Sequence, residues 1–117
     1  MIGQVDLPAP VFFATVQPET VFFASWESAE AAVVDRATWT VTSTLDIGRP
    51  TAGGTLATDG TSIYVPAADS QEVVVVDAST FTVVDTIEPV DPWSVAIEGG
   101  RLWSVEEGGA VAQRFDL

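Results

Sequence analysis

Acidic residues and tryptophans recur where the chain is expected to reverse direction, and these residue types are suited to holding a ligand. Tryptophan rings stack on sugars and attract cations, while carboxylates accept hydrogen bonds from hydroxyl groups or bind hard cations. A structural interpretation stands beside this one: Trp93 fills space between two sheets after Pro92, and the acids are simply solvated. The candidates for a ligand-binding face are Trp26, Glu27, Arg49, Asp69, Asp91, Trp93, Glu106 and Glu107.

A second polar set recurs at regular intervals. Asp35, Asp77 and Asp116 occupy equivalent places in three similar segments, and Thr38 and Thr80 follow the first two by three residues. A catalytic carboxylate has no reason to recur in every segment. An aspartate that accepts hydrogen bonds from backbone N–H groups of its own turn does account for the spacing. We therefore predict that these five residues are structural turn residues.

The chain has no histidine and no cysteine. It therefore lacks the commonest general base, the thiolate nucleophile and the usual zinc ligands. A hydrolase that uses two carboxylates, such as Asp91 with Glu106, stays open, because paired acids can perform acid–base work. The oxygen ligands would suit calcium, yet no D-x-[DN]-x-[DN]-G loop occurs. We assign no catalytic residue, no metal ligand and no cofactor.

The net charge of −13, with four arginines and no lysine, argues against partners that carry phosphate. Nucleic acids and anionic membranes are bound by clustered cations, so neither is expected. The longest apolar runs, such as Val73 to Val76, have the length of a strand and are too short to span a membrane. The first ten residues lack the pattern of a signal peptide. The compartment is left open, the extracellular space included.

The 117-residue sequence repeats itself. The segment "VFFASWESAEAAVVDRATWTVTSTL" (21–45) aligns without a gap on "IYVPAADSQEVVVVDASTFTVVDTI" (63–87), at an offset of 42 residues. A third copy, at an offset of 39 residues from the second, runs from Trp93 to Asp116. A period of about 40 residues is typical of propeller blades or of helical repeats.

The local pattern within each unit is that of β-strands. The second unit is rich in Val, Thr and aromatic residues, and its Asp59-Gly60 pair between apolar runs favours a hairpin. Each unit is consistent with four antiparallel strands, A to D from the centre of a propeller outward, with the B–C and D–A connections at one end. In the second unit the expected strands are 54–58, 62–66, 72–77 and 81–88.

The segment "LATDGTSIYVPAADSQEVVVVDASTFTVVDTI" resembles a blade of the YVTN-type β-propeller family. It has that family's DG turn, "YV" strand, "V-x-V-x-D" strand and "T-x-V-V-x-T-I" strand. The third unit, "DPWSVAIEGGRLWSVEE", is similar to the streptogramin-lyase-like propellers. That likeness implies metal-bound carboxylates or histidines at the channel mouth, and this chain has no histidine to fill such a role. The resemblance implies the fold more strongly than any activity.

These patterns predict an all-β segment of a propeller, made of three four-stranded antiparallel blades within one domain. Residues 11–46, 53–88 and 93–117 form the blades, and the last one lacks its outer strand. Residues 2–7 align one period ahead of the end of the first outer strand. They are therefore expected to be an outer clasp strand, permuted to the N-terminus, that completes the last blade.

Three blades leave two apolar faces and a strand edge uncovered, whereas closed propellers usually have about four to eight blades. Two copies of the chain would form a six-bladed ring, with each clasp strand on the partner's last blade. We expect a homodimer. The alternatives are a monomeric partial ring, a ring of three copies, and a fragment of a larger propeller.

The predicted function is that of a non-catalytic binding or scaffolding module, with a small molecule or a protein bound at the loops. The alternative is a carboxylate- or metal-dependent hydrolase or lyase of the streptogramin-lyase-like type. The absence of histidine favours binding over catalysis. A functionless fragment or engineered subset of a larger propeller is the third interpretation.

Overall fold

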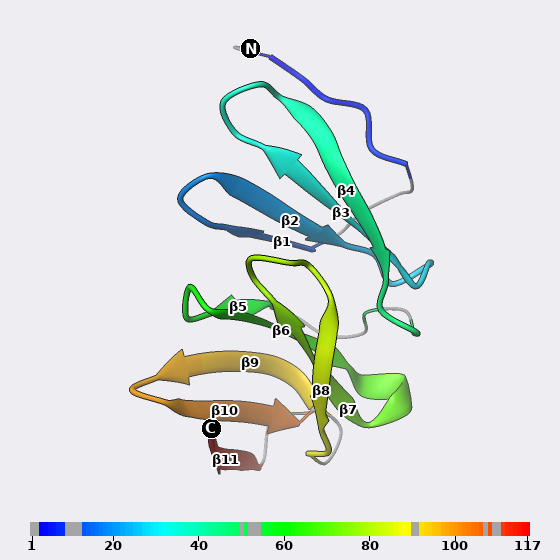
Figure 1. The fold of residues 1–117 in the computed structure, drawn as a ribbon. Coiled ribbons are helices and arrows are strands. Elements are labelled where there is room, and N and C mark those ends of the chain that lie inside the picture. The colour runs from blue at the N-terminus through cyan, green and yellow to red at the C-terminus, as the bar shows by residue number, and fades with distance from the viewer. Residues whose placement is uncertain are drawn as a thin grey trace.

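The computed structural model describes residues 3–8, 13–49, 51, 55–89, 92–106, 108 and 111–117. Three antiparallel sheets follow one another along the chain and stack in that order (Figure 1). We call them blades 1, 2 and 3. The predicted all-β propeller architecture is thereby confirmed. Among the described residues, no helix has the length and apolar character needed to cross a bilayer.

In the described part of the chain, blades 1 and 2 each contain four strands in sequential order, and blade 3 contains three. The strands of blade 1 are β1 (Phe13–Val16), β2 (Thr20–Ala24), β3 (Glu30–Asp35) and β4 (Thr40–Asp46). Those of blade 2 are β5 (Ala57–Thr58), β6 (Ser62–Ala67), β7 (Glu72–Asp77) and β8 (Val83–Ile87), with a 3-10 turn, η1 (Ala68–Ser70), before β7. Those of blade 3 are β9 (Pro92–Glu98), β10 (Arg101–Glu106) and β11 (Ala112–Asp116).

The repeat extends to the details of strand pairing. The β3–β4 ladder shifts register between Val33 and Val34, and the β7–β8 ladder shifts between Val75 and Val76, at the same repeat position. The innermost strands of blades 2 and 3 are neighbours, since Thr55 and Ser94 form a parallel bridge. Blade 2 therefore packs between its two sequence neighbours, as a propeller requires.

Alternating side chains make both faces of each blade apolar, and this alternation builds two cores. Between blades 1 and 2, the buried residues are Phe22, Ala24, Ala31, Val33, Ile47, Ile63, Val65, Val74 and Val76. Between blades 2 and 3, they are Tyr64, Val73, Val75, Val95 and Leu102. One face of blade 2 thus packs on blade 1 and the other on blade 3, so both of its faces are covered.

The N-terminal segment, Gly3–Pro8, runs along the free side of blade 1 (Figure 1). In the single chain these described residues form no strand. A Cβ atom on Gly3 would lie 3.3 Å from the Trp39 ring, and Val5 shares a pocket with Val21 and Phe23 of β2. Pairing of this segment with the third blade of another copy stays a prediction, and Ile2 lies outside the described residues.

Candidate functional site

The connections between strands gather at two opposite ends of the blades (Figure 1). The β2–β3, β4–β5, β6–β7 and β8–β9 connections lie at one end, which we call the loop face. The hairpin turns β1–β2, β3–β4, β5–β6, β7–β8 and β9–β10 lie at the other, the turn face. The described residues among those predicted to bind a ligand belong to the loop face, and the repeated aspartates belong to the turn face.

Trp26 is the most prominent aromatic residue of the loop face. Its side chain is 52% exposed, and its ring meets Phe13 of β1 edge-on, with centroids 6.5 Å apart and an angle of 72°. Glu27 is exposed beside it, and its backbone N–H donates a hydrogen bond to Ser25 Oγ at 3.0 Å. The serine hydroxyl thus holds the loop, which keeps the Trp26 ring at the surface where a planar ligand could stack.

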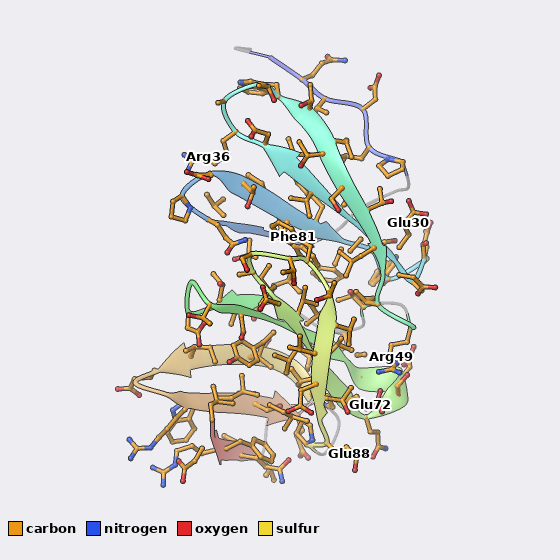
Figure 2. All side chains as sticks on the ribbon, in the orientation of Figure 1. Glu30, Arg36, Arg49, Glu72, Phe81 and Glu88 are labelled. Atoms are coloured by element: carbon orange, nitrogen blue, oxygen red, sulfur yellow. The ribbon has the colours of Figure 1, made fainter. Side chains whose placement is uncertain are left out.

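Arg49 forms an ion pair within the chain. Its Nη1 forms an ion pair with Glu72 Oε2 at the start of β7, and both side chains are half-buried (Figure 2). The pair ties the connection after blade 1 to blade 2, so the structure uses Arg49 to hold the blades together. The sequence interpretation missed Glu72, because such a contact across the repeat is visible only once the blades are stacked.

The remaining predicted residues lie on separate elements. Asp69 is exposed on η1, Trp93 is half-buried in β9, and Glu106 is half-buried at the end of β10. Asp91 and Glu107 lie outside the described residues. Within the described part of the chain, no group of three or more acidic side chains could hold a metal ion. Asp69, Trp93 and Glu106 thus belong to three different elements.

A pocket at the loop-face end of blade 1 includes two carboxylates that the sequence interpretation did not select. Glu30 and Asp46 are directly opposite each other where β3 and β4 pair. The repeat aligns Glu30 and Asp46 with Glu72 and Glu88, which lie at one end of the expected strands 72–77 and 81–88 of the second unit. Polar residues at such strand ends are neighbours across a ladder, so the sequence did contain a signal for this pair. The lining residues are Ser28, Ala29, Glu30, Thr44, Leu45 and Asp46.

At the turn face, the carboxylates of Asp35 and Asp77 hold their own turns. Asp35 Oδ1 accepts hydrogen bonds from the backbone N–H groups of Ala37 at 2.8 Å and Thr38 at 2.9 Å. Asp77 Oδ1 accepts equivalent bonds from Ser79 and Thr80. These contacts agree with the spacing that the sequence showed.

The third member of the series makes a different contact. Asp116 lies at the end of β11, and its Oδ1 is 3.4 Å from Arg101 Nε on the neighbouring strand. Both side chains are exposed, so this ion pair contributes little to stability.

The hydrogen bonds to the Asp35 and Asp77 carboxylates stabilise the charged form. The Thr80 N–H, with the Ser79 hydroxyl and N–H, lowers the pKa of Asp77 from 3.8 to about 2. The Thr38 and Ala37 N–H groups lower the pKa of Asp35 in the same way. The folded chain thus binds fewer protons than the unfolded chain between these pKa values, and protonation in that window favours unfolding.

We expect the thermal stability of the protein to fall as the pH is lowered from about 4 to about 2, and Asp77→Asn to weaken this dependence. The variant should also melt a few degrees lower at neutral pH, because an amide oxygen is a weaker acceptor than a carboxylate. Melting curves followed by circular dichroism at several pH values measure both effects. Asp35→Asn should act in the same direction. An unchanged pH dependence in both variants would contradict the assignment of these carboxylates to the turns.

An aromatic residue in a left-handed conformation follows each of these turns. Trp39 has a backbone φ of 60° and Phe81 has a φ of 54°, values that residues other than glycine rarely adopt. Phe81 packs against the core between blades 1 and 2. Trp39 holds the equivalent place on blade 1 but is 47% exposed, with Gly3 against its ring. The same strained turn thus presents a packed aromatic ring in blade 2 and a half-exposed one in blade 1.

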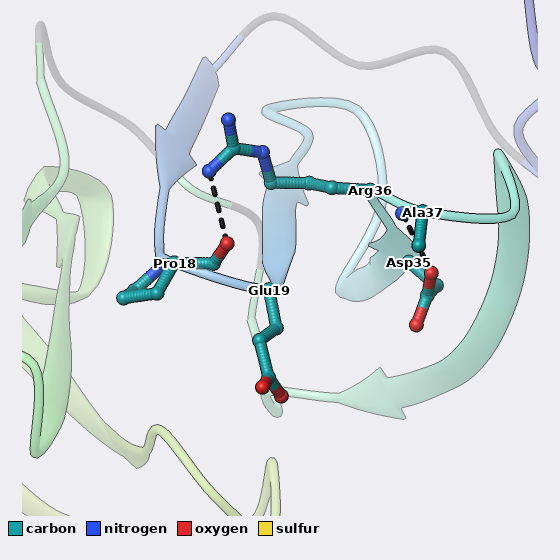
Figure 3. A pocket seen from close by; sticks show the side chains of 5 residues that line it. All are labelled: Pro18, Glu19, Asp35, Arg36 and Ala37. Carbon is teal, nitrogen blue, oxygen red and sulfur yellow. Dashed lines mark hydrogen bonds between the residues drawn. The ribbon is translucent and has the colours of Figure 1, made fainter.

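The turn face of blade 1 has an open pocket of about 600 Å³ (Figure 3). Its lining residues are Pro18, Glu19, Asp35, Arg36 and Ala37. Arg36 Nη1 donates hydrogen bonds to the carbonyl oxygens of Gln17 at 2.9 Å and Pro18 at 3.0 Å, which fixes the guanidinium at the rim. This pocket lies at the end of the blade opposite the one selected from the sequence.

No protein-family model matches the chain, and no curated protein sequence matches it. Solved structures do. Hydrazine synthase from Kuenenia stuttgartiensis is 25% identical, with a TM-score of 0.78, over 99% of this chain and 35% of that one. Apo AztD from Citrobacter koseri is 16% identical, with a TM-score of 0.70, over 79% of this chain and 27% of that one.

A second crystal structure of Citrobacter koseri AztD gives similar values, with 15% identity and a TM-score of 0.69. These neighbours have β-propeller-type folds, which agrees with the stacked blades of this chain. The chain spans about a third of the length of the solved proteins that it matches. The likeness therefore establishes the type of fold.

Proposed function

We propose that this chain is a non-catalytic binding or scaffolding module of the β-propeller type, and that two copies close one ring. The observation that supports the proposal concerns the two ends of the three-blade stack. Blade 3 has three strands, and the N-terminal segment is held against blade 1 outside any sheet.

The free face of blade 3 carries exposed apolar side chains that could pack against another blade. Trp103 is 36% exposed there, Val105 is similarly exposed, and the Arg114 guanidinium lies 5.7 Å from the centre of the Trp103 ring. The repeat register aligns Trp103 with Tyr64, which is buried between blades 2 and 3. Exposed apolar side chains on a face that is covered elsewhere in the repeat favour contact with a further blade.

At the opposite end of the stack, the N-terminal segment packs on the free face of blade 1. Leu45 and Ile47, at the end of β4 and just after it, pack on the core that Phe81 also contacts. One period earlier, Gly3 meets the ring of Trp39, and Val5 lies beside apolar residues of β2 and β3. Gly3 and Val5 thus contact blade 1 in the way that their counterparts Leu45 and Ile47 contact blade 2. This position supports the proposal that the segment is the outer strand of a further blade.

A second copy can supply those three strands as β9, β10 and β11. In a two-fold symmetric ring, each copy gives its blade 3 and receives the other copy's N-terminal segment, so both strand edges become paired. The same contact buries apolar surface at both ends, worth roughly 25 cal/mol per Å². Binding at the assembled loop face is favoured over catalysis, because the sequence offers no histidine or cysteine.

We expect light scattering on the 117-residue chain to give twice the 12.3 kDa mass of one copy. The measurement should be made over a range of concentrations, because a dimer held by two symmetric contacts dissociates on dilution. A mass of one copy at every concentration would overturn the ring proposal, and would favour closure by other blades or a stable partial ring.

A further inference from the structure

We propose that the hairpin turn of blade 3, Glu98–Arg101, docks in the turn-face pocket of blade 1 of a second copy. In this contact Trp39 is the apolar anchor, and Arg36 pairs with Glu98 of the second copy. The inference rests on the proposed ring and names the residues that decide how its two copies recognise each other.

The same arrangement of a hairpin turn facing the next blade occurs once within the chain, between blades 1 and 2. There the β1–β2 turn, Gln17–Thr20, forms one side of a pocket of about 370 Å³ at the turn face. The other side belongs to blade 2 and includes the ring of Phe81, which reaches the core between the two blades (Figure 2). The blade 2 residues are Gly60, Ala78, Ser79 and Phe81.

The repeat register transfers this half-site onto blade 1. The counterparts of the four blade 2 residues are Pro18, Arg36, Ala37 and Trp39. The first three line the open turn-face pocket of blade 1 (Figure 3). That pocket is larger, at about 600 Å³ against about 370 Å³. All of the described residues that line it belong to blade 1, whereas the pocket between blades 1 and 2 has residues of two blades.

Blade 3 offers that turn. Ile97 is opposite Leu102 across the β9–β10 hairpin, just as Val16 is opposite Val21 across the β1–β2 hairpin. The four residues between each pair, Glu98–Arg101 and Gln17–Thr20, are therefore equivalent in structure as well as in sequence. A blade 3 placed ahead of blade 1 presents Glu98 where Gln17 faces blade 2.

The charges of the two surfaces agree with this placement. Arg36 takes the position of Ala78 in the pocket, where its Nη1 donates to the Gln17 and Pro18 carbonyl oxygens, and the proposed docking brings the carboxylate of Glu98 to this guanidinium. The pocket also contains the carboxylates of Glu19 and Asp35, and the arriving turn ends in Arg101, which is also near Asp116 of its own chain. Three of the five groups that meet in the contact come from the pocket and two from the turn, with cations and anions on both sides. In a chain with only four arginines and a net charge of −13, having one arginine on each side favours recognition of this surface.

Trp39 is expected to supply the apolar part of the contact. Its side chain is 47% exposed, whereas its counterpart Phe81, which has a similar left-handed backbone, packs on the core between blades 1 and 2. Large aromatic side chains at the centre of an interface often dominate binding. Trp39→Gly tests this without straining the turn, since glycine adopts positive φ freely. The dissociation constant of the dimer should rise by about 30-fold or more.

Charge reversal provides the sharper experiment. Arg36→Glu and Glu98→Arg should each raise the dimer dissociation constant about tenfold or more, because like charges then meet at both symmetric contacts. Mixing the two variants should restore a dimer, since the two substituted side chains then form an ion pair of opposite polarity at one contact and the natural pair forms at the other. Sedimentation equilibrium of each variant alone and of the mixture measures this.

Glu88→Arg is the matched control for Glu98→Arg. It makes the same charge change on an exposed residue after β8, away from the proposed contact. Its dimer should be as tight as that of the unsubstituted chain. If the unsubstituted chain is monomeric, the ring proposal itself fails. If it is dimeric and the reversals do not weaken it, or if mixing restores nothing, the pairing of Arg36 with Glu98 is overturned while the ring stands.

Discussion

Replacing Phe22 with alanine is expected to destabilise the folded chain by about 3–5 kcal/mol. The Phe22 side chain has 0% exposure and lies in the core between blades 1 and 2, with Val33 on one side and Ile63 and Val65 on the other. Truncation removes its apolar contacts and leaves a cavity that two paired sheets cannot easily close. Domains of this size are stable by only about 5–15 kcal/mol, so the loss is a large share of the total.

Urea unfolding followed by circular dichroism measures this effect. Val84→Ala is the control, because Val84 is 57% exposed on β8 and should change stability by about 0.5 kcal/mol or less. Equal losses in the two variants would contradict the assignment of the main core to the contact between blades. The stacking of blades would then contribute less than the folding of each blade alone.

The stacked blades could be predicted from the sequence because the repeat and the strand alternation carry the same information. The expected strand 72–77 is the observed β7, and 62–66 differs from β6 by one residue. Runs such as Val73 to Val76 are buried on both faces, as expected of a blade with neighbours on either side. Local propensity and long-range packing agree in these strands, which makes them predictable.

The differences arise where backbone geometry overrides composition. The outer strand of blade 2 was expected from residue 81, but β8 begins at Val83, because Phe81 adopts positive φ after the Asp77 turn. An aromatic residue with high strand propensity gives no sign of a left-handed conformation in a sequence. The 3-10 turn η1 between β6 and β7 was likewise not expected.

The candidate site was predicted less well, since it depends on contacts between blades. The sequence placed Arg49 among free ligand-binding groups, whereas it forms an ion pair with Glu72 of the next blade. The pocket around Arg36 was also missed, because its residues looked like ordinary turn residues. Only the stacked blades show that blade 2 presents the same half-site to a neighbour.

Deleting residues 1–8 is expected to have the largest effect on assembly. This segment places Val5 against Val21, Phe23 and Val34, so its loss uncovers the free face of blade 1. In the proposed ring it is also the outer strand for β11 of the second copy, so each deletion leaves a raw strand edge there. The truncated chain should therefore dissociate to single copies or aggregate through the exposed apolar face.

Size-exclusion chromatography with light scattering distinguishes these outcomes from the intact dimer, and dye binding to apolar surface reports the uncovered face. Asp6→Asn is the control, since this exposed side chain should not affect pairing of the backbone. Val5→Asp is the complementary variant: it keeps the segment but places a charge in the apolar pocket, which charged groups enter only at a high cost. If both the deletion and Val5→Asp leave a tight dimer, the copies meet through another surface and the N-terminal segment is not the clasp.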